Sequence, residues 1–232
     1  MTDAPIRNPD LDPVRFEHPL KHLSESLKRR RKTRIVALGS SSTAGANGIL
    51  AFPARLEWLL RQNNYGRMID VVNRGIGGQE APEELSRIEC DVLAEQPALV
   101  IWQVGTNAVY RSISYNPAAV EAAIAVGLDL LAEQPVDVVV MDLQYTAALV
   151  NLAEKLAIAE DIEQRIEKVC AAAKVNLFKR WALMKRWCTE AQIPLAAMDD
   201  GGDDHLHMSE WATAYTTAAL GRSIMSAVNP EV

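Results

Sequence analysis

The chain has 232 residues, of which 49% are hydrophobic and 23% charged, and its net charge is -6. This composition is ordinary for a soluble globular protein of one domain or two small ones, and it argues against wholesale disorder. We expect neither a nucleic-acid-binding protein nor a membrane-spanning one, because the chain is not basic and no apolar stretch approaches roughly 20 residues.

The N-terminal part differs from the rest of the chain. The first 27 residues contain four prolines and little apolar periodicity. We therefore expect an irregular arm over residues 1–33 and one domain over residues 34–232. The start lacks the charged and apolar pattern of a secretory signal, so we expect a cytoplasmic protein unless its native start is missing. Residues 28–34 form a basic run, either a solvated charge cluster or a contact for an anionic surface or substrate.

From residue 34 onwards, short apolar runs alternate with helical patterns. The predicted strands are Arg34–Leu38, Met68–Asn73, Ala98–Val104, Val136–Leu143 and, more weakly, Val175–Phe178. Apolar residues at helical spacing lie over Phe52–Leu60, Leu85–Val92, Val120–Leu131 and Leu149–Val169. A last helix is predicted to begin near Ser209, a residue type that favours helix N-caps. This alternation predicts a three-layer α/β/α fold around a five-stranded parallel sheet.

Ligands of open parallel sheets bind beyond the carboxyl ends of the strands, so the residues that follow each strand are the candidates. The first strand leads into Gly39–Gly45, which lacks both the lysine of a phosphate-binding loop and the Gly-x-Ser-x-Gly pattern. The second leads into Asn73–Gln79, whose three glycines bring backbone N–H groups to a helix start that suits an oxyanion. The third leads into Val104–Ala108, where Asn107 offers a side-chain amide. Each segment alone is also consistent with a plain turn.

A fourth cluster, at Asp199–Ser209, contains four aspartates and two histidines. Both residue types bind metals, but no second ligand cluster exists elsewhere in the sequence, so we predict no metal. An acid–base pair is the sharper interpretation. Asp204 precedes His207 by three residues, and this turn can set the carboxylate against one imidazole nitrogen while the other nitrogen faces a cleft.

In order and spacing, the four segments resemble the motif blocks of the SGNH (GDSL) hydrolases, which are named for a Ser, a Gly, an Asn and a His. The matching blocks are Gly39-Ser40-Ser41, Asn73-Arg74-Gly75-Ile76-Gly77-Gly78, Gly105-Thr106-Asn107-Ala108 and Asp204-His205-Leu206-His207. The resemblance spans roughly residues 34–225. Ser40 and Ala108 stand where the family usually has Asp, which we expect to alter the bracing of the loops rather than the chemistry.

The resemblance implies a flavodoxin-like SGNH hydrolase fold and a carboxylic ester or thioester hydrolase that acts on a small acyl ester without metal or cofactor. Ser41 would be the nucleophile, His207 its base and Asp204 the residue that orients His207. The oxyanion would be held by the backbone N–H groups of Ser41 and Gly78 and by the Asn107 amide. A catalytically weakened domain that binds an acylated ligand or partner is the alternative, because two family aspartates are missing.

Other residues compete for some of these roles. Ser40 and Ser42 are rival nucleophiles, although the motif favours Ser41. The residue three positions before His205 is Gly202 and not a carboxylate, so a surface histidine is the simpler interpretation of His205. Asp203 could replace Asp204 only through a different turn. For the acyl pocket we expect contributions from three residues, for which ordinary core packing is the alternative. These are Tyr110, Leu143 and Tyr145.

Overall fold

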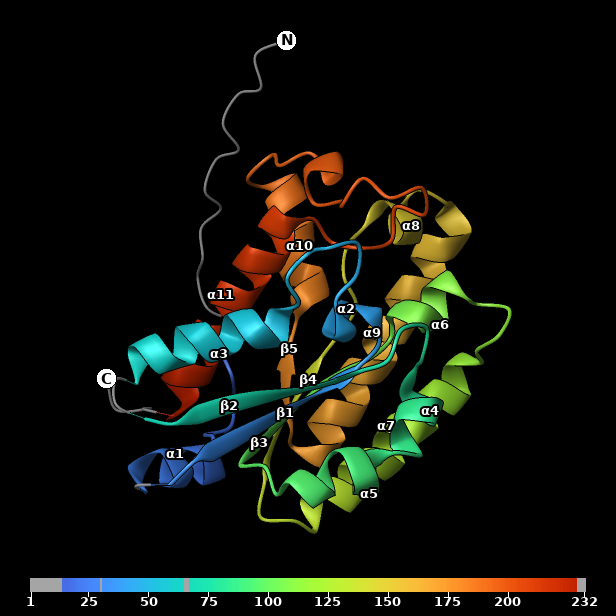
Figure 1. Cartoon of the computed structure of the whole chain (residues 1–232). Helices are drawn as coiled ribbons and strands as arrows, with labels where there is room; N and C mark the ends of the chain where they lie inside the picture. The colour runs from blue at the N-terminus through green and yellow to red at the C-terminus, as the bar shows by residue number, and fades with distance from the viewer. Residues whose placement is uncertain (1–13, 30, 65–66, 229–232) are drawn as a thin grey trace.

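The computed structural model describes residues 14–29, 31–64 and 67–228. Within them, one sheet of five parallel strands has the order β2-β1-β3-β4-β5 (Figure 1). The strands are β1 (Thr33–Gly39), β2 (Ile69–Gly75), β3 (Leu99–Gln103), β4 (Asp137–Met141) and β5 (Asn176–Phe178). Each lies within two residues of its predicted bounds. The predicted parallel α/β/α fold is confirmed, and its strand order is the flavodoxin-like one.

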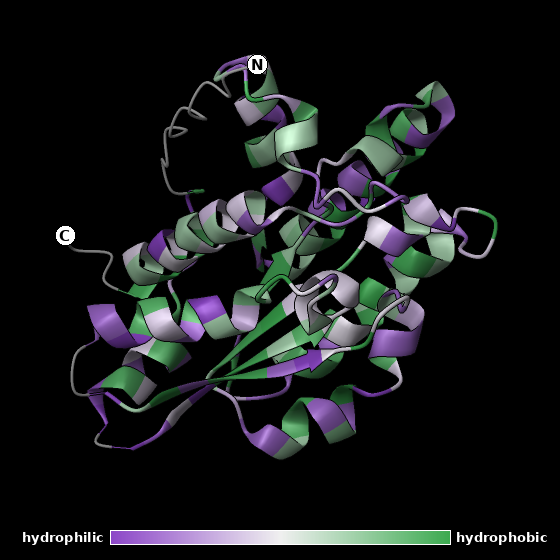
Figure 2. Cartoon of the chain, turned by 45° about the horizontal axis from the view of Figure 1, so that its top comes forward, coloured by the Kyte–Doolittle hydropathy of each residue, from purple (hydrophilic) through white to green (hydrophobic). Residues whose placement is uncertain are grey.

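Helices cover both faces of the sheet (Figure 1). One face carries α1 (Lys21–Lys28), α3 (Phe52–Asn63), α10 (Arg180–Thr189) and α11 (Glu210–Val228). The other carries α4 (Ala81–Leu85), α5 (Ile88–Asp91), α7 (Pro117–Ala132) and α9 (Ala153–Ala173). Successive side chains of β1 alternate between the two cores, so Ile35 joins the first and Val36 the second. The central strands β1, β3 and β4 are therefore largely apolar on both sides, and most of the sheet is green in Figure 2.

The expectation of an irregular arm is wrong for Lys21–Lys28, which form helix α1. Leu20, Leu23 and Leu27 are buried in the first core, and Leu20 N donates to Ala227 O at 3.1 Å. Their spacing of three and four residues is a helical signal that the neighbouring prolines obscured. Residues 1–13 lie outside the described residues, and the boundary at residue 34 stays a prediction.

Three members of the basic run form ion pairs with acidic side chains: Arg29 pairs with Glu25 within one helical turn at 3.6 Å, and the other two pair with residues of other segments. Lys32 Nζ lies 2.7 Å from Asp70 Oδ2, and Arg34 lies 3.6 Å from Glu95. The hydrogen bond from Lys32 is the largest influence on Asp70 and lowers the pKa of its carboxyl. Arg30 lies outside the described residues. For Lys32 and Arg34 the interpretation as a solvated charge cluster fits.

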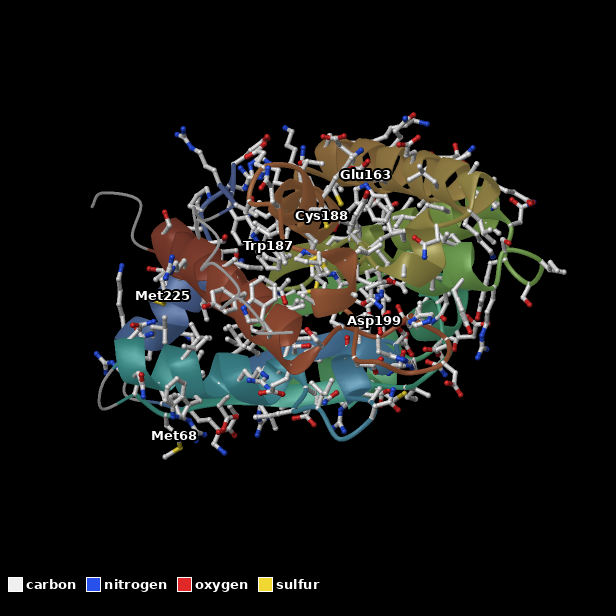
Figure 3. All side chains as sticks on the ribbon, turned by 90° about the horizontal axis from the view of Figure 1, so that it is seen from above. Met68, Glu163, Trp187, Cys188, Asp199 and Met225 are labelled. Carbon is white, nitrogen blue, oxygen red and sulfur yellow. The ribbon has the colours of Figure 1, made fainter. Side chains whose placement is uncertain are left out.

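Some helices differ from their predicted form. The stripe over Leu85–Val92 is broken into α4, α5 and a 3₁₀ turn, η1 (Leu93–Glu95), because Arg87 leaves the helical conformation at φ -119° and ψ 10°. Helix α10 was not predicted. Its Trp187 packs edge-to-face on Trp211 of α11 with ring centroids 5.3 Å apart, between the two helices in Figure 3. The last helix is confirmed, and Ser209 Oγ accepts from Ala212 N at 3.1 Å.

Short helices mark the carboxyl edge of the sheet. They are α2 (Ser41–Ala44), α6 (Thr106–Tyr110) and α8 (Ala147–Val150), which follow β1, β3 and β4. A further 3₁₀ turn, η2 (Leu195–Ala197), precedes the segment 199–209 that enters α11. The candidate residues of three sequence blocks lie on these segments, and Gly78 of the remaining block lies on the connection between β2 and α4.

Candidate active site

Ser41 is the first residue of α2, two residues beyond the end of β1. The turn needs glycine at position 39, because a Cβ there would lie 2.4 Å from Thr43 Oγ1. The neighbouring hydroxyls are engaged elsewhere: Ser40 Oγ donates to Gln103 Oε1 at 3.0 Å and Ser42 Oγ to Gln144 Oε1 at 2.6 Å. Ser40 is also buried, so these contacts favour Ser41 over both rivals as the reactive hydroxyl.

His207 lies against Ser41 although the two are far apart in the sequence. Its Nε2 is 3.0 Å from Ser41 Oγ, within the reach that a general base needs. Its Nδ1 is 3.8 Å from Asp204 Oδ2, which is longer than a hydrogen bond. This nitrogen is buried and has no hydrogen-bond partner among the described residues. The structure therefore brings Ser41 and His207 together and leaves Asp204 just beyond hydrogen-bond distance.

His205 has a carboxylate partner, contrary to the prediction. Its Nδ1 lies 3.0 Å from Asp199 Oδ2, a residue six positions earlier rather than three. The His205 side chain is 61% exposed, so its predicted surface position is correct. Asp199 is labelled in Figure 3, on the segment that leads into α11. Asp203 is exposed, and no contact among the described residues joins it to His207.

The connection after β2 approaches Ser41 through its glycines. A Cβ on Gly75 would lie 2.1 Å from Ala44 N, and one on Gly77 would lie 3.8 Å from Ser41 Cβ. Gly78 has a positive φ of 82°, a conformation that favours glycine. In the part of the chain that the structure describes, no hydrogen bond uses the backbone N–H of Ser41 or Gly78. Both groups are free to donate to an anionic oxygen.

A hydrogen bond between Asn107 and Gln79 joins α6 to the connection between β2 and α4. Asn107 is 3% exposed, and its Nδ2 donates to Gln79 O at 2.8 Å. An amide nitrogen carries two hydrogens, so this contact leaves one for another acceptor. The predicted oxyanion donors therefore lie on connections that contact each other directly.

Glu80 is a residue that the sequence analysis missed. Its buried carboxylate accepts from Gly105 N at 2.7 Å, from Ala108 N at 2.9 Å and from Ala81 N at 3.0 Å. Burial raises the pKa of this carboxyl, and the backbone donors oppose that rise. Burial, followed by the charge of Glu80, raises the pKa of Glu84 well above its ordinary value. Glu80 thus links the glycine connection to the Asn107 connection from within the protein.

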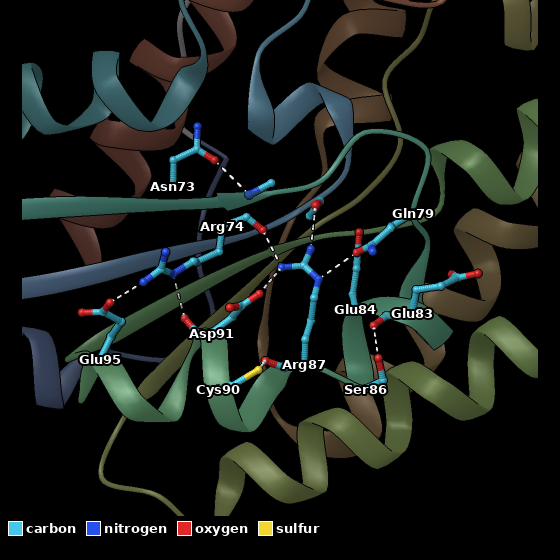
Figure 4. Close-up of polar contacts among 12 residues, drawn as sticks. Asn73, Arg74, Gln79, Glu83, Glu84, Ser86, Arg87, Cys90, Asp91 and Glu95 are labelled. Atoms are coloured by element: carbon cyan, nitrogen blue, oxygen red, sulfur yellow. Dashed lines mark hydrogen bonds and ion pairs between the residues drawn. The ribbon is translucent and has the colours of Figure 1, made fainter.

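Arg87 is a second missed residue, and Figure 4 shows its contacts. Its guanidinium donates to the carbonyls of Gly39 at 3.1 Å and Arg74 at 2.8 Å, and to Gln79 Oε1 at 2.7 Å. These groups belong to the ends of β1 and β2 and to the glycine connection. The sequence offered no signal for this role, because Arg87 lies beside the apolar stripe of Leu85, Ile88 and Val92 among other polar residues.

A family model described as the Non-GDSL lipase-like family matches residues 9–230. The chain belongs to this family. A curated relative, the uncharacterized lipoprotein YqeF of Bacillus subtilis (strain 168), is 34% identical over 76 residues, which are 32% of this chain and 31% of that protein. The chain therefore matches about a third of the length of that relative.

Solved structures share the fold of this Non-GDSL lipase-like protein. The acetylxylan esterase Axe2 of Geobacillus stearothermophilus aligns with a TM-score of 0.70 at 18% identity, over 84% of this chain and 96% of that chain. The lipase/acylhydrolase of Enterococcus faecalis aligns with a TM-score of 0.67 at 19% identity, over 83% of this chain and 95% of that chain. LAE5 is an alpha/beta hydrolase enzyme from the metagenome of Lake Arreo, Spain. It aligns with a TM-score of 0.69 at 16% identity, over 83% of this chain and 96% of that chain. The predicted SGNH-like hydrolase fold is confirmed, and membership of a lipase-like family supports an ester hydrolase.

The three residues predicted to line an acyl pocket lie in different surroundings. Leu143 is fully buried, and its Cγ would lie 3.1 Å from a Cβ on Gly105, which corresponds to core packing. Tyr145 packs edge-to-face on Trp181 with centroids 4.8 Å apart and lines a hollow of about 400 Å³ beside Cys188 and residues 192–195. Tyr110 is half-buried and packs against the second core. A role in acyl binding stays a prediction for Tyr110 and Tyr145.

Two further observations concern metals and membranes. Among residues 14–29, 31–64 and 67–228, no three histidine, cysteine or carboxylate side chains gather as a metal ion would require. Over the same ranges, no helix combines the length and the apolar character needed to cross a membrane.

Proposed function

We propose that this Non-GDSL lipase-like protein is a serine hydrolase that cleaves carboxylic esters or thioesters through an acyl-enzyme on Ser41. The observation that carries this proposal is the 3.0 Å contact between Ser41 Oγ and His207 Nε2, next to two free backbone N–H groups. A hydroxyl, a base and anion donors are the parts that acyl transfer requires.

In the proposed mechanism, His207 takes the Ser41 proton as the Ser41 oxygen attacks the acyl carbonyl. The tetrahedral oxyanion accepts hydrogen bonds from Ser41 N, Gly78 N and the second amide hydrogen of Asn107. Collapse of this intermediate breaks the bond to the alcohol or thiol, to which His207 returns the proton. Water then attacks the acyl-enzyme by the same route, releasing the acid and restoring Ser41.

Asp204 has the role of stabilising the imidazolium form of His207. The present 3.8 Å separation must shorten by about 1 Å for a hydrogen bond to form, and catalytic contacts often tighten only when substrate is bound. Catalytic mutants of the Geobacillus acetylxylan esterase Axe2 replace a serine, an aspartate and a histidine, and the aspartate lies three positions before the histidine. The Asp204–His207 spacing is the same, which supports the assignment.

The first prediction tests Ser41. Hydrolysis of an activated acetate ester should fall about a thousandfold or more in kcat in Ser41→Ala, because the nucleophile is lost. Ser26→Ala is the matched control, since Ser26 is also half-buried and its Oγ forms one hydrogen bond, to Thr33 Oγ1, at the opposite end of the sheet. A fluorophosphonate should label wild type on the peptide that contains Ser41. Equal rates in wild type and Ser41→Ala would reject the proposal.

A binding domain with little turnover is the second candidate, and the unpartnered Nδ1 of His207 favours it. Such a domain would bind an acylated ligand without hydrolysing it. The same pair of proteins decides between the two functions, because a binder has the same residual rate with and without the Ser41 hydroxyl.

A further inference from the structure

Gln144 connects the helix of Ser41 to the segment of His207. Its Oε1 accepts from Ser42 Oγ at 2.6 Å, and its Nε2 donates to Leu206 O at 2.6 Å. Gln144 is fully buried in the connection that follows β4. One rigidly held side chain therefore bonds the residue after Ser41 and the residue before His207.

The orientation of this amide follows from its partners. Leu206 O can only accept, so the NH₂ group of Gln144 must face it, and the amide oxygen must face Ser42. The Ser42 hydroxyl then has to donate to Gln144. This arrangement fixes the Ser42 proton away from His207, so that Ser41 alone meets the imidazole.

His207 depends on such backbone anchors more than on its carboxylate. Its Nδ1 has no partner among the described residues, and Asp204 Oδ2 is 3.8 Å away. Two backbone hydrogen bonds hold the segment instead. Asp200 N donates to His207 O and Ala148 N donates to His205 O, both at 3.1 Å. Neither of these two contacts reaches α2. Asn47, on the loop after α2, donates from Nδ2 to Asp200 Oδ2 at 2.6 Å, whereas Gln144 bonds the residues directly adjacent to Ser41 and His207.

We propose that Gln144 is a positioning residue that sets the distance between Ser41 and His207, a role that rests on the proposed function. A displacement of about 1 Å between reacting groups can cost about a hundredfold in rate. Gln144 acts on the chemical step through Ser42 and Leu206 and makes no contact with the substrate. It should therefore affect kcat rather than KM.

The experiment is a double-mutant cycle with Ser42→Ala and Gln144→Leu on an activated acetate ester. We expect kcat to fall about tenfold in Ser42→Ala and about 10- to 100-fold in Gln144→Leu, with KM within about threefold of wild type. Because both changes break one bridge, the double variant should lie within about threefold of Gln144→Leu. Ser26→Ala again serves as the control.

Thermal melting of each variant separates positioning from stability. Ser42→Ala keeps the Gln144–Leu206 bond, so it should lower kcat at a temperature well below its Tm even if Gln144→Leu is poorly folded. Single variants within threefold of wild type in kcat, or losses that multiply in the double variant, would overturn the proposal. Full activity in Ser41→Ala would instead overturn the proposed function and, with it, any positioning role.

Discussion

At the scale of single residues, the site depends on which polar groups are already engaged. Ser40 and Ser42 donate to glutamines, while Ser41 Oγ meets His207 Nε2. Asn107 gives one amide hydrogen to Gln79 O and retains another. The reactive groups are thus distinguished from their neighbours by their hydrogen-bond partners rather than by residue type.

Replacing Asn107 tests the oxyanion assignment. Asn107→Ala should lower kcat for the acetate ester about a hundred- to a thousandfold, because the transition state loses one donor. Asn107→Asp has nearly the same shape but a carboxylate in place of the amide, so it should be at least as inactive. Steady-state kinetics of both variants check the prediction. A loss below threefold in Asn107→Ala would remove this residue from the role.

At the scale of elements, two buried charged side chains hold the ends of the strands together. Arg87 binds a carbonyl near the end of each of β1 and β2 and the glycine connection, and Glu80 binds backbone N–H groups around α6. Glu80 also takes part in the capping box of α4, in which Glu83 Oε2 accepts from Glu80 N at 3.1 Å. The candidate oxyanion donors lie on the segments that these two side chains join.

Glu80→Ala should therefore destabilise the protein more than Glu83→Ala does. Loss of Glu80 leaves Gly105 N and Ala108 N buried without an acceptor, which we expect to cost about 2–5 kcal/mol of unfolding free energy. Exposed Glu83 contributes the reciprocal cap and accepts a hydrogen bond from Tyr115 OH at 3.2 Å, which together are worth about 1–2 kcal/mol. Denaturant unfolding of the two variants measures the difference. Equal midpoints would show that the Glu80 contacts add nothing beyond the cap.

At the scale of the whole molecule, two buried polar residues, Asp142 and Arg180, join the end of β4 to α10. Arg180 Nη2 donates to Asp142 O at 2.7 Å, and Asp142 Oδ1 accepts from Trp181 N at 2.9 Å. Asp142 Oδ2 and Arg180 Nη1 have no hydrogen-bond partner among the described residues. Burial raises the pKa of Asp142 from 3.8 to about 7 and lowers that of Arg180 to about 10. Both shifts disfavour the charged forms.

Stability should consequently depend on pH through Asp142. Between its ordinary pKa of 3.8 and about 7, the folded protein retains a proton that the unfolded chain releases, so this contribution decreases as the pH rises. Asp142→Asn keeps the oxygen that accepts from Trp181 N and removes the titration. Unfolding free energies measured from pH 4 to pH 8 should show that the wild type loses stability relative to Asp142→Asn. Parallel profiles would contradict the assignment.

The strands, most of the long helices and the motif residues could be predicted without a structure, because apolar periodicity and strand-end glycines are local patterns. Two features escaped these local patterns. Neighbouring prolines obscured the helical spacing of α1, and the helix break at Arg87 is accompanied by long-range hydrogen bonds. The folded molecule was needed to show that Asp199 contacts His205, that Asp204 lies beyond hydrogen-bond distance of His207, and that Gln144 joins Ser42 to Leu206. The reason is physical: buried polar groups must find partners wherever the fold brings them, and those partners follow no period in the sequence.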